Sequence, residues 1–456
     1  MNKSELRDDI DFGNQNIPKL FKKLLIPTLW GMLSTALFII TDGIFVGKGI
    51  GNDALAAVNI VAPFFSVAIS IGLMLGMGGS ILASIHLANK KLKTARIVVT
   101  QATFTAVIAL VIISALSLLF LDELLTAMGA PAELLPMARE YGYGIIPFLI
   151  MGALTNTIPF FIRLDGAPNY AMKCCIVGAV VNIILDYLFI FEFGWGLLGA
   201  AIATSIGNTL GTVMAVAYLF RKDKMLRFIK VKLSNKGIRM SLRNVWYMCK
   251  LGGASFIGQS AVIIMIICGN LVFVRELGTD GVAAFSICCY TFPLIYMIYT
   301  AVSQSAQPII SYNYASGSMS RVNEVFRLAL IWSVAIGVTL TLGMILLAPH
   351  ISALFLTKGT AAYEIALKGL PLFSIGFISF AINMLSIGYF QSIERINMAM
   401  AIIILRGIIF MPLFFYIMPH IWSQNGGWLA LPATEIATNI CLIFIYMNIK
   451  SRNAKD

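Results

Sequence analysis

Residues 182–190, Asn-Ile-Ile-Leu-Asp-Tyr-Leu-Phe-Ile, place one amide and one carboxylate inside an otherwise apolar run. On a helix, Asn182 and Asp186 lie one turn apart on the same face. Burying a carboxylate in such a run is costly, and within membrane segments these residues usually mark an ion or proton path. The stretch therefore predicts a membrane span that carries a functional acid.

The rest of the chain has the composition of a membrane protein. Of its 456 residues, 59% are hydrophobic and only 12% are charged, which lies outside the range of soluble globular domains. Apolar runs of about 20 residues recur from Leu20 to Met447. We expect an all-α integral membrane protein with twelve transmembrane helices, near residues 19–46, 54–82, 95–120, 134–162, 170–191, 196–220, 244–274, 281–308, 323–346, 363–390, 397–418 and 426–448.

The net charge of +12 is explained by where the cations lie. They concentrate in alternate connections, most densely in residues 221–243, whereas the opposite loops hold few cations and several acids. This positive-inside asymmetry predicts an inner (plasma) membrane protein with both termini in the cytoplasm, and it accounts for the charge without nucleic acid. The N-terminus lacks a signal-peptide pattern, so we expect the first span to be retained. The seven cysteines show no metal-ligand spacing, and no cofactor is expected.

The two halves of the chain are repeats. Shifting the second half back by 227 positions aligns the first two spans without a gap, and it places Gly51 on Gly278 and Ser84 on Ser311. We therefore expect an N-terminal lobe at residues 1–220, a basic cytoplasmic linker at 221–243 and a C-terminal lobe at 244–456. Because each lobe has an even number of spans, the copies should be parallel repeats, related by a pseudo-two-fold axis along the membrane normal around a central cavity.

Four polar side chains of the first half are expected at a similar depth. At the helical rise per residue, Asp42 and Asp186 lie roughly 9 Å below the outer mouth and Thr204 about 12 Å below it, with Asn182 one turn deeper than Asp186. Oxygen ligands of this kind suit a proton relay or a hard cation such as Na⁺. The competing interpretation is that Asp42 only reaches the outer interface and that Asp186 bonds a neighbouring helix.

The repeat favours a functional role for these acids. In the second half, Asp42 falls on Gly269, and a shift of 228 places Asn182 and Asp186 on Phe410 and Phe414. Packing residues tend to recur between copies, whereas a site used once need occur only once. We therefore expect the coupling site to lie in the N-terminal lobe alone.

Other residues suggest a substrate cavity and a bend. Pro27 interrupts the first span, where it would kink the helix, either as a static feature or as a moving one. Arg406 and Glu435 are the charges left inside the eleventh and twelfth spans, and they could form a buried ion pair that fixes packing. Helix faces that carry flexible methionine and aromatic side chains suit the binding of organic cations of varied shape. The candidate cavity residues are Tyr290, Tyr296, Met297, Asn383, Arg406 and Glu435.

Over nearly its full length the chain resembles the multidrug and toxic compound extrusion (MATE) transporters. The matching motifs are Pro27, Asp42, Val46-Gly47, Gly51, Ala56-Ala57, Arg163-x-x-Gly166-x-Pro168, Asn182-x-x-x-Asp186, Gly196-x-x-Gly199-Ala200-Ala201-x-Ala203-Thr204, Gln307-Pro308-x-x-Ser311-Tyr312-Asn313-Tyr314-Ala315, Gln391-Ser392, Arg406 with Pro412, and Ala433-Thr434-Glu435. Singly these matches are weak, but their order and spacing are specific.

The resemblance implies an antiporter that exports organic, often cationic and amphipathic compounds in exchange for H⁺ or Na⁺. In DinF-like relatives, the positions matching Asp42, Asn182, Asp186 and Thr204 form the cation or proton site, and the first helix bends near the position of Pro27. The NorM-like branch instead carries acids in spans seven and ten, which this chain lacks apart from Glu364 at the edge of span ten. The DinF-like branch is therefore the closer match. Small-molecule substrates, a lipid bilayer and a functional monomer are the expected partners and state.

Three alternatives differ in what they require. A flippase for a lipid-linked precursor, from the same superfamily, usually has fourteen spans and a cation-lined cavity, whereas this chain has twelve expected spans. A membrane-embedded enzyme acting on lipids would use Asp42 and Asp186 as acid and base, and the repeat gives it no support. A passive channel would need rings of polar groups in both halves, which the sequence lacks.

Overall fold

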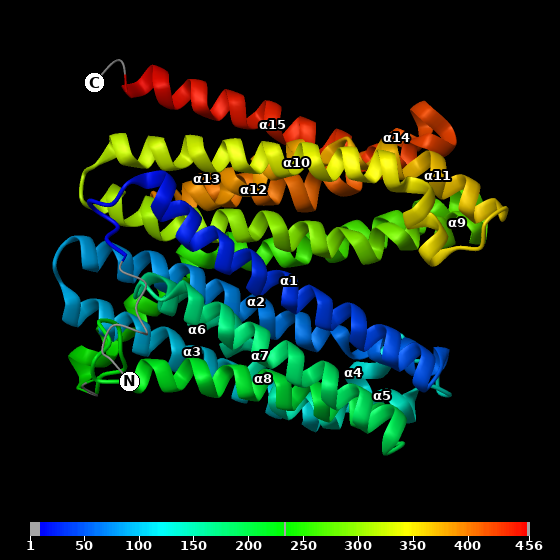
Figure 1. Ribbon diagram of the computed structural model, residues 1–456, viewed down its shortest axis with the longest axis horizontal. Helices are drawn as coiled ribbons and strands as arrows, with labels where there is room; N and C mark the ends of the chain where they lie inside the picture. Colours follow the sequence, from blue (N-terminus) through cyan, green and yellow to red (C-terminus); the bar gives the residue numbers. More distant parts are fainter. Residues whose placement is uncertain (1–9, 232–233, 454–456) are drawn as a thin grey trace. The chain divides into compact units, whose positions relative to one another are not determined.

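The computed structural model describes residues 10–231 and 234–453, and all regular secondary structure in these ranges is helical (Figure 1). The elements are α1 (Ile17–Gly49), α2 (Asn52–Ala88), α3 (Leu92–Leu119), α4 (Leu121–Ala127), α5 (Leu135–Ile145), η1 (Ile146–Phe148), α6 (Leu149–Leu164), α7 (Pro168–Tyr187), η2 (Leu188–Glu192), α8 (Gly196–Phe220), α9 (Asn235–Ala315), α10 (Met319–Phe355), α11 (Ala361–Ser374), α12 (Gly376–Ser392), α13 (Ile396–Ile404), η3 (Leu405–Phe410), α14 (Met411–Trp422), η4 (Ser423–Asn425) and α15 (Gly426–Asn453). The predicted all-α class is confirmed.

The number of crossings follows from helix length. Among the described residues, 9 helical stretches are long and apolar enough to cross a membrane, and α11 with α12 adds a further span that is bent by 42°. Two of the stretches, Gly237–Ala315 with 79 residues and Ile396–Met447 with 52, are each long enough for two crossings, since one crossing takes about 20 residues. Counting each of them twice recovers the twelve crossings expected from the sequence.

A glycine breaks the backbone at the same place in both halves. Gly51 separates α1 from α2 with φ 133° and ψ 178°, and Gly278 interrupts α9 with φ 65° and ψ −153°. Residues other than glycine are essentially excluded from this region of backbone space. Because Gly51 and Gly278 are copies of each other, the long helix α9 contains the same two spans that appear as α1 and α2 in the first half.

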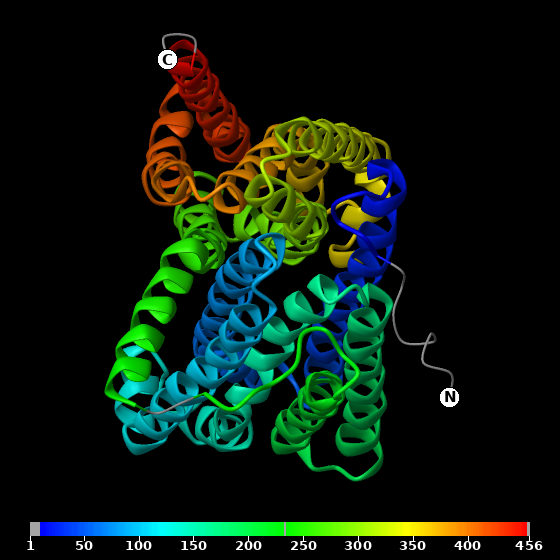
Figure 2. The same cartoon turned by 90° about the vertical axis from the view of Figure 1, so that its left-hand side faces the viewer.

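The helices form two compact units. Unit 1 comprises Met1–Phe256 and Gln307–Val322, and unit 2 comprises Ile257–Ala306 and Asn323–Asp456. In unit 1, α7 packs between α1 and α8, and α2 packs on α3 and α6; Figure 2 views the helices nearly end-on. These units differ from the expected boundaries at 220 and 244, because the two ends of α9 group with the first half. The lobe boundaries from the repeat remain a prediction.

The segment before α1 is bound within unit 1 to the end of α9, which carries Asn313, and to the start of α10, which carries Arg321. The side chain of Arg321 donates to the backbone carbonyls of Phe12 and Gln15 at 3.1 and 2.8 Å, and through Nε to Asn313 Oδ1 at 2.9 Å. The amide of Asn313 also donates to the carbonyl of Phe12 at 2.9 Å. Phe12 is buried against the ring of Tyr312. A segment without regular structure is thereby held by charged hydrogen bonds to its carbonyls.

The segment after α8 is held in a comparable way. The buried carboxylate of Asp165 accepts hydrogen bonds from the backbone N–H of Leu226 and, at 2.7 Å, from the hydroxyl of Tyr218. Arg96 donates through Nε to the carbonyl of Met225 at 2.7 Å. The first part of the basic linker is therefore an ordered segment that covers the ends of α3, α6 and α8.

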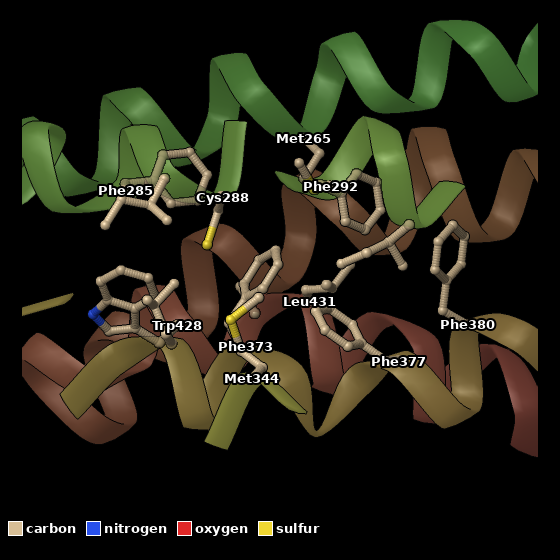
Figure 3. Packing of buried hydrophobic residues seen from close by; sticks show 14 of the residues in the cluster. Met265, Phe285, Cys288, Phe292, Met344, Phe373, Phe377, Phe380, Trp428 and Leu431 are labelled. Atoms are coloured by element: carbon tan, nitrogen blue, oxygen red, sulfur yellow. The ribbon is translucent and has the colours of Figure 1, made fainter. Parts of the chain in front are cut away.

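Unit 2 is held together by an aromatic core (Figure 3). Phe273 and Phe285 stack with ring centroids 4.6 Å apart, and Trp428 packs edge-on against Phe273 at 4.7 Å. Trp428 fits only because residue 369 is glycine, since a Cβ there would lie 2.0 Å from the indole ring. The core joins α9, α11, α12 and α15 into one body.

Candidate functional site

Glycines bring α7 and α8 close enough for their polar side chains to meet. A Cβ added at Gly178 would lie 2.9 Å from the carbonyl oxygen of Gly207, and one added at Gly207 would lie 2.8 Å from Cβ of Asn182. Small residues allow such close backbone contact between membrane helices. Asn182 and Thr204 consequently face each other across this contact.

The structure brings together the four residues predicted to form the coupling site. The amide of Asn182 donates to the hydroxyl of Thr204 at 3.2 Å. The carboxyl groups of Asp42, on α1, and Asp186, on α7, lie within hydrogen-bonding reach of each other. Asp186 is 0% exposed, while Asn182 and Thr204 are also buried. A π-helical segment, η2, follows Asp186 directly, and such segments often occur at functional sites.

The site is rich in acceptor oxygens that lack a protein donor. These oxygens are Oδ1 of Asp42, Oδ1 of Asn182 and both carboxylate oxygens of Asp186. Two ionised carboxylates can only accept hydrogen bonds and repel each other, so they pair only when a proton or a cation lies between them. The arrangement is chemically suited to taking up one positive charge. No group of three or more His, Cys, Asp or Glu side chains in the described chain could hold a metal ion, so a cation here would also need the neutral oxygens of Asn182 or Thr204.

Tyr141 belongs to this site and was missed by the sequence analysis. It lies on α5, is 5% exposed, and is close enough to Asp42 and Asp186 to be influenced by their charges. The depth count that selected the acids could have found it. Tyr141 is six residues past the first residue of α5, about 9 Å along the helix by the usual rise, which matches the estimate for Asp42.

A second polar cluster lies in unit 2. Arg406 Nε donates to both carboxylate oxygens of Glu435, at 2.7 and 2.9 Å, and Asn383 Nδ2 donates to Glu435 Oε2 at 2.8 Å. None of the three side chains is more than 1% exposed. The ion pair that the sequence analysis considered is therefore present, and Asn383 from α12 completes it.

The other three candidate cavity residues, Tyr290, Tyr296 and Met297, do not gather as a group around the Arg406–Glu435 ion pair. Tyr290 is 53% exposed and stacks on Phe355 with centroids 5.8 Å apart, whereas Tyr296 is buried in the aromatic core. Met297 is half-buried on the same helix, α9. Pro27 lies inside α1, which continues as a single helix from Ile17 to Gly49. A shared role of these residues in substrate binding stays a prediction.

In the second half, the positions that correspond to Asn182 and Asp186 are apolar. The sequences Ala203-Thr204 and Ala433-Thr434 correspond, and the hydroxyl of Thr434 donates to the carbonyl of Phe410 at 3.3 Å. Phe410 stands where Asn182 stands in the first half, but it offers Thr434 only a backbone carbonyl, and the shorter hydrogen bond of the Thr434 hydroxyl is to the carbonyl of Ala430 at 2.8 Å. The rings of Phe410 and Phe414 lie 5.9 Å apart and take the places of the amide and the acid.

Comparison with known proteins agrees with this architecture. The MatE family model matches residues 27–188 and 257–416, which together make up more than half of the chain and cover both repeats. The chain belongs to the MatE family. MATE proteins are membrane transporters, which agrees with the many helices in the described chain that are long and apolar enough to cross a membrane.

Individual relatives have low sequence identity to this MATE protein, but they match nearly its whole chain. It is 24% identical over 457 residues to the multidrug export protein MepA of Staphylococcus haemolyticus, covering 98% of this chain and 96% of the relative. It is 23% identical to MepA of Staphylococcus aureus strain MRSA252, covering 96% and 95% of the two chains. A solved structure described as the outward-facing conformation of a multidrug resistance MATE family transporter of the MOP superfamily matches with a TM-score of 0.88, at 23% identity, over 96% of this chain and 97% of that one. The twelve-helix MATE fold is thus established.

Proposed function

We propose that this protein is a secondary active antiporter that exports organic, often cationic and amphipathic compounds in exchange for H⁺ or Na⁺ by alternating access. The observation that carries the proposal is the pairing of Asp42 and Asp186 beside the Asn182–Thr204 contact, where Oδ1 of Asp42 and both carboxylate oxygens of Asp186 lack protein donors. An inward-moving cation that binds there offsets one of the two negative charges, and its release restores the repulsion. The MepA relatives, which are multidrug export proteins, support the substrate class.

Each residue has a stated role in this proposal. Asp42 and Asp186 hold the exchanged charge, and Asn182 and Thr204 supply neutral oxygens that suit either a protonated carboxyl group or a Na⁺ ion. Pro27 allows α1, which carries Asp42, to bend when the charge state changes. Tyr290 and Met297, which expose part of their side chains on α9, are the proposed substrate contacts. The protein would act as a monomer in the plasma membrane with both termini in the cytoplasm.

The test is uptake of a fluorescent organic cation into everted vesicles that contain the protein, under an imposed H⁺ gradient or an imposed Na⁺ gradient. Asp42→Asn and Asp186→Asn should each reduce gradient-driven uptake to the level of empty vesicles. Asp53→Asn is the matched control, because Asp53 is an exposed acid at the start of α2. Undiminished uptake by both site variants would show that coupling lies elsewhere.

The flippase alternative makes a different demand on the structure. A cavity for a lipid-linked, phosphate-bearing precursor needs accessible basic groups, whereas Arg406 is buried and already bound to Glu435. In the same vesicles, movement of a fluorescent lipid-linked precursor without movement of any organic cation would favour the flippase over the antiporter.

A further inference from the structure

The Asn383–Glu435 pair of unit 2 presents the donor types that bind cations. Glu435 offers both carboxylate oxygens, Oδ1 of Asn383 has no protein donor, and the face of Phe380 closes one side of the cluster. The amide nitrogen of Asn383 donates to Oε2 and also to the backbone carbonyl of Glu435 at 3.0 Å, which orients the carboxylate. A carboxylate and an aromatic face together make a buried cation cradle, and the amide of Asn383 holds the carboxylate in place.

In this protein the cation in the cradle is a side chain. The guanidinium of Arg406 lies 4.4 Å from the centre of the Phe380 ring while its Nε contacts both oxygens of Glu435. Arg406 enters from η3, a π-helical segment within the eleventh span. A π-helix adds a residue to the turn and so changes which side chains face inward. The fifth span also has a π-helical segment, η2, beside Asp186, but no basic residue is present there.

The repeat shows that the charges are distributed in opposite ways. The alignments that match Asn182 with Phe410 and Thr204 with Thr434 place Arg406 on Gly178 and Glu435 on Ser205. The first half thus has two acids and, in the described chain, no cationic side chain beside them. The second half has one acid, Glu435, and its own cation, Arg406, which lies one helical turn before Phe410, the counterpart of Asn182. The first arrangement needs a charge from outside, and the second does not.

We propose that Arg406 is a tethered cation that permanently fills a cation-binding cradle formed by Asn383, Glu435 and Phe380, so that the second half carries no exchangeable ion. This inference rests on unit 2 alone and does not depend on which ion binds at Asp42 and Asp186. It predicts that the cradle accepts a small free cation once the tether is removed.

The experiment compares purified wild type, Arg406→Ala and the double variant Arg406→Ala with Glu435→Gln. Thermal unfolding is followed by intrinsic fluorescence in methylguanidinium chloride, with choline chloride at equal ionic strength as the control salt. Arg406→Ala should be stabilised saturably by methylguanidinium, because the free cation replaces the missing side chain. Wild type and the double variant should show only the general, non-saturating destabilisation that a guanidinium salt causes, with no saturable rise in melting temperature. A folded Arg406→Ala variant that shows no saturable rise either would overturn the proposal.

A second comparison decides the question if Arg406→Ala cannot be recovered in folded form. If the defect is an uncompensated buried carboxylate, adding Glu435→Gln removes it, and the double variant should be recovered near the wild-type yield. Arg406→Lys, which keeps a tethered cation, should also be recovered. If the double variant is lost as completely as Arg406→Ala, the shape of Arg406 and not its charge supports the fold, and the proposal fails.

Discussion

Ser84 of α2 and Ser311 of α9 hydrogen-bond to each other, with 2.9 Å between their hydroxyl oxygens, and they are copies of one position in the internal repeat. A second pair of copies, Ser80 and Gln307, is bonded at 3.1 Å one turn away. Both contacts lie within unit 1, which contains Gln307–Val322. The 227-residue shift found in the sequence therefore appears in the structure as direct contact.

This contact leads to a prediction about transport. Ser84→Cys together with Ser311→Cys should form a disulfide on oxidation, because side chains whose tips touch can bring their Cβ atoms into bonding range. If the contact opens during alternating access, the cross-link should stop uptake in the vesicle assay, and a reductant should restore it. The single variants are the controls for the seven native cysteines. A cross-linked protein that transports at the normal rate would show that the contact stays closed throughout the cycle.

Gly51 and Gly278 should be equally intolerant of side chains. Both have backbone angles available almost only to glycine, so Gly51→Ala or Gly278→Ala should lower the free energy of unfolding by about 1–3 kcal/mol. Gly343→Ala is the matched control, since a Cβ added at this glycine of α10 meets no atom within 4 Å. Thermal unfolding in detergent measures the effect. Equal melting temperatures for all three variants would contradict the argument from backbone strain.

The two equivalent threonines should behave differently. Thr204→Val removes the partner of the Asn182 amide and leaves that buried donor unsatisfied, a cost of about 1–3 kcal/mol. We expect a higher ion concentration for half-maximal uptake in the vesicle assay. Thr434→Val removes hydroxyl contacts to the backbone carbonyls of Ala430 and Phe410 and leaves no buried side-chain donor unsatisfied, so it should leave the ion dependence unchanged. An identical change in both variants would indicate a general packing effect and not a coupling site confined to the first half.

Arg321 should hold the segment before α1 in place. Arg321→Gln loses charged hydrogen bonds to the carbonyls of Phe12 and Gln15, which should destabilise that segment by about 2 kcal/mol. Hydrogen exchange of a peptide that covers residues 10–20 should accelerate in this variant. Arg327→Gln, an exposed change on the same helix, is the control. If both variants exchange at the wild-type rate, the segment is held mainly by the burial of Phe12.

Much of the molecule could be predicted from the order of its residues. Apolar runs long enough to cross a bilayer are expected to be helical, because the hydrocarbon core of the bilayer has no water to form hydrogen bonds with free backbone N–H and C=O groups. The repeat located the break at Gly278 inside what is otherwise one long helix, α9. The spacing of Asn182 and Asp186 and the depth count for Asp42 and Thr204 selected four residues that the structure brings together.

Only the tertiary structure decided which distant groups pair. Helical periodicity says which face a residue occupies, but it does not say which helix that face meets. The pattern of the sequence therefore did not single out Tyr141 as a neighbour of Asp42 and Asp186. The hydrogen bonds that Asp165 and Arg96 make to the linker join residues 61 and 129 positions apart, and helical periodicity does not predict them. The sequence left Arg406 and Glu435 as two charges at similar depth. The packing of α12, η3 and α15 turned them into a mutually neutralised pair, while the acids at Asp42 and Asp186 were left without a basic partner.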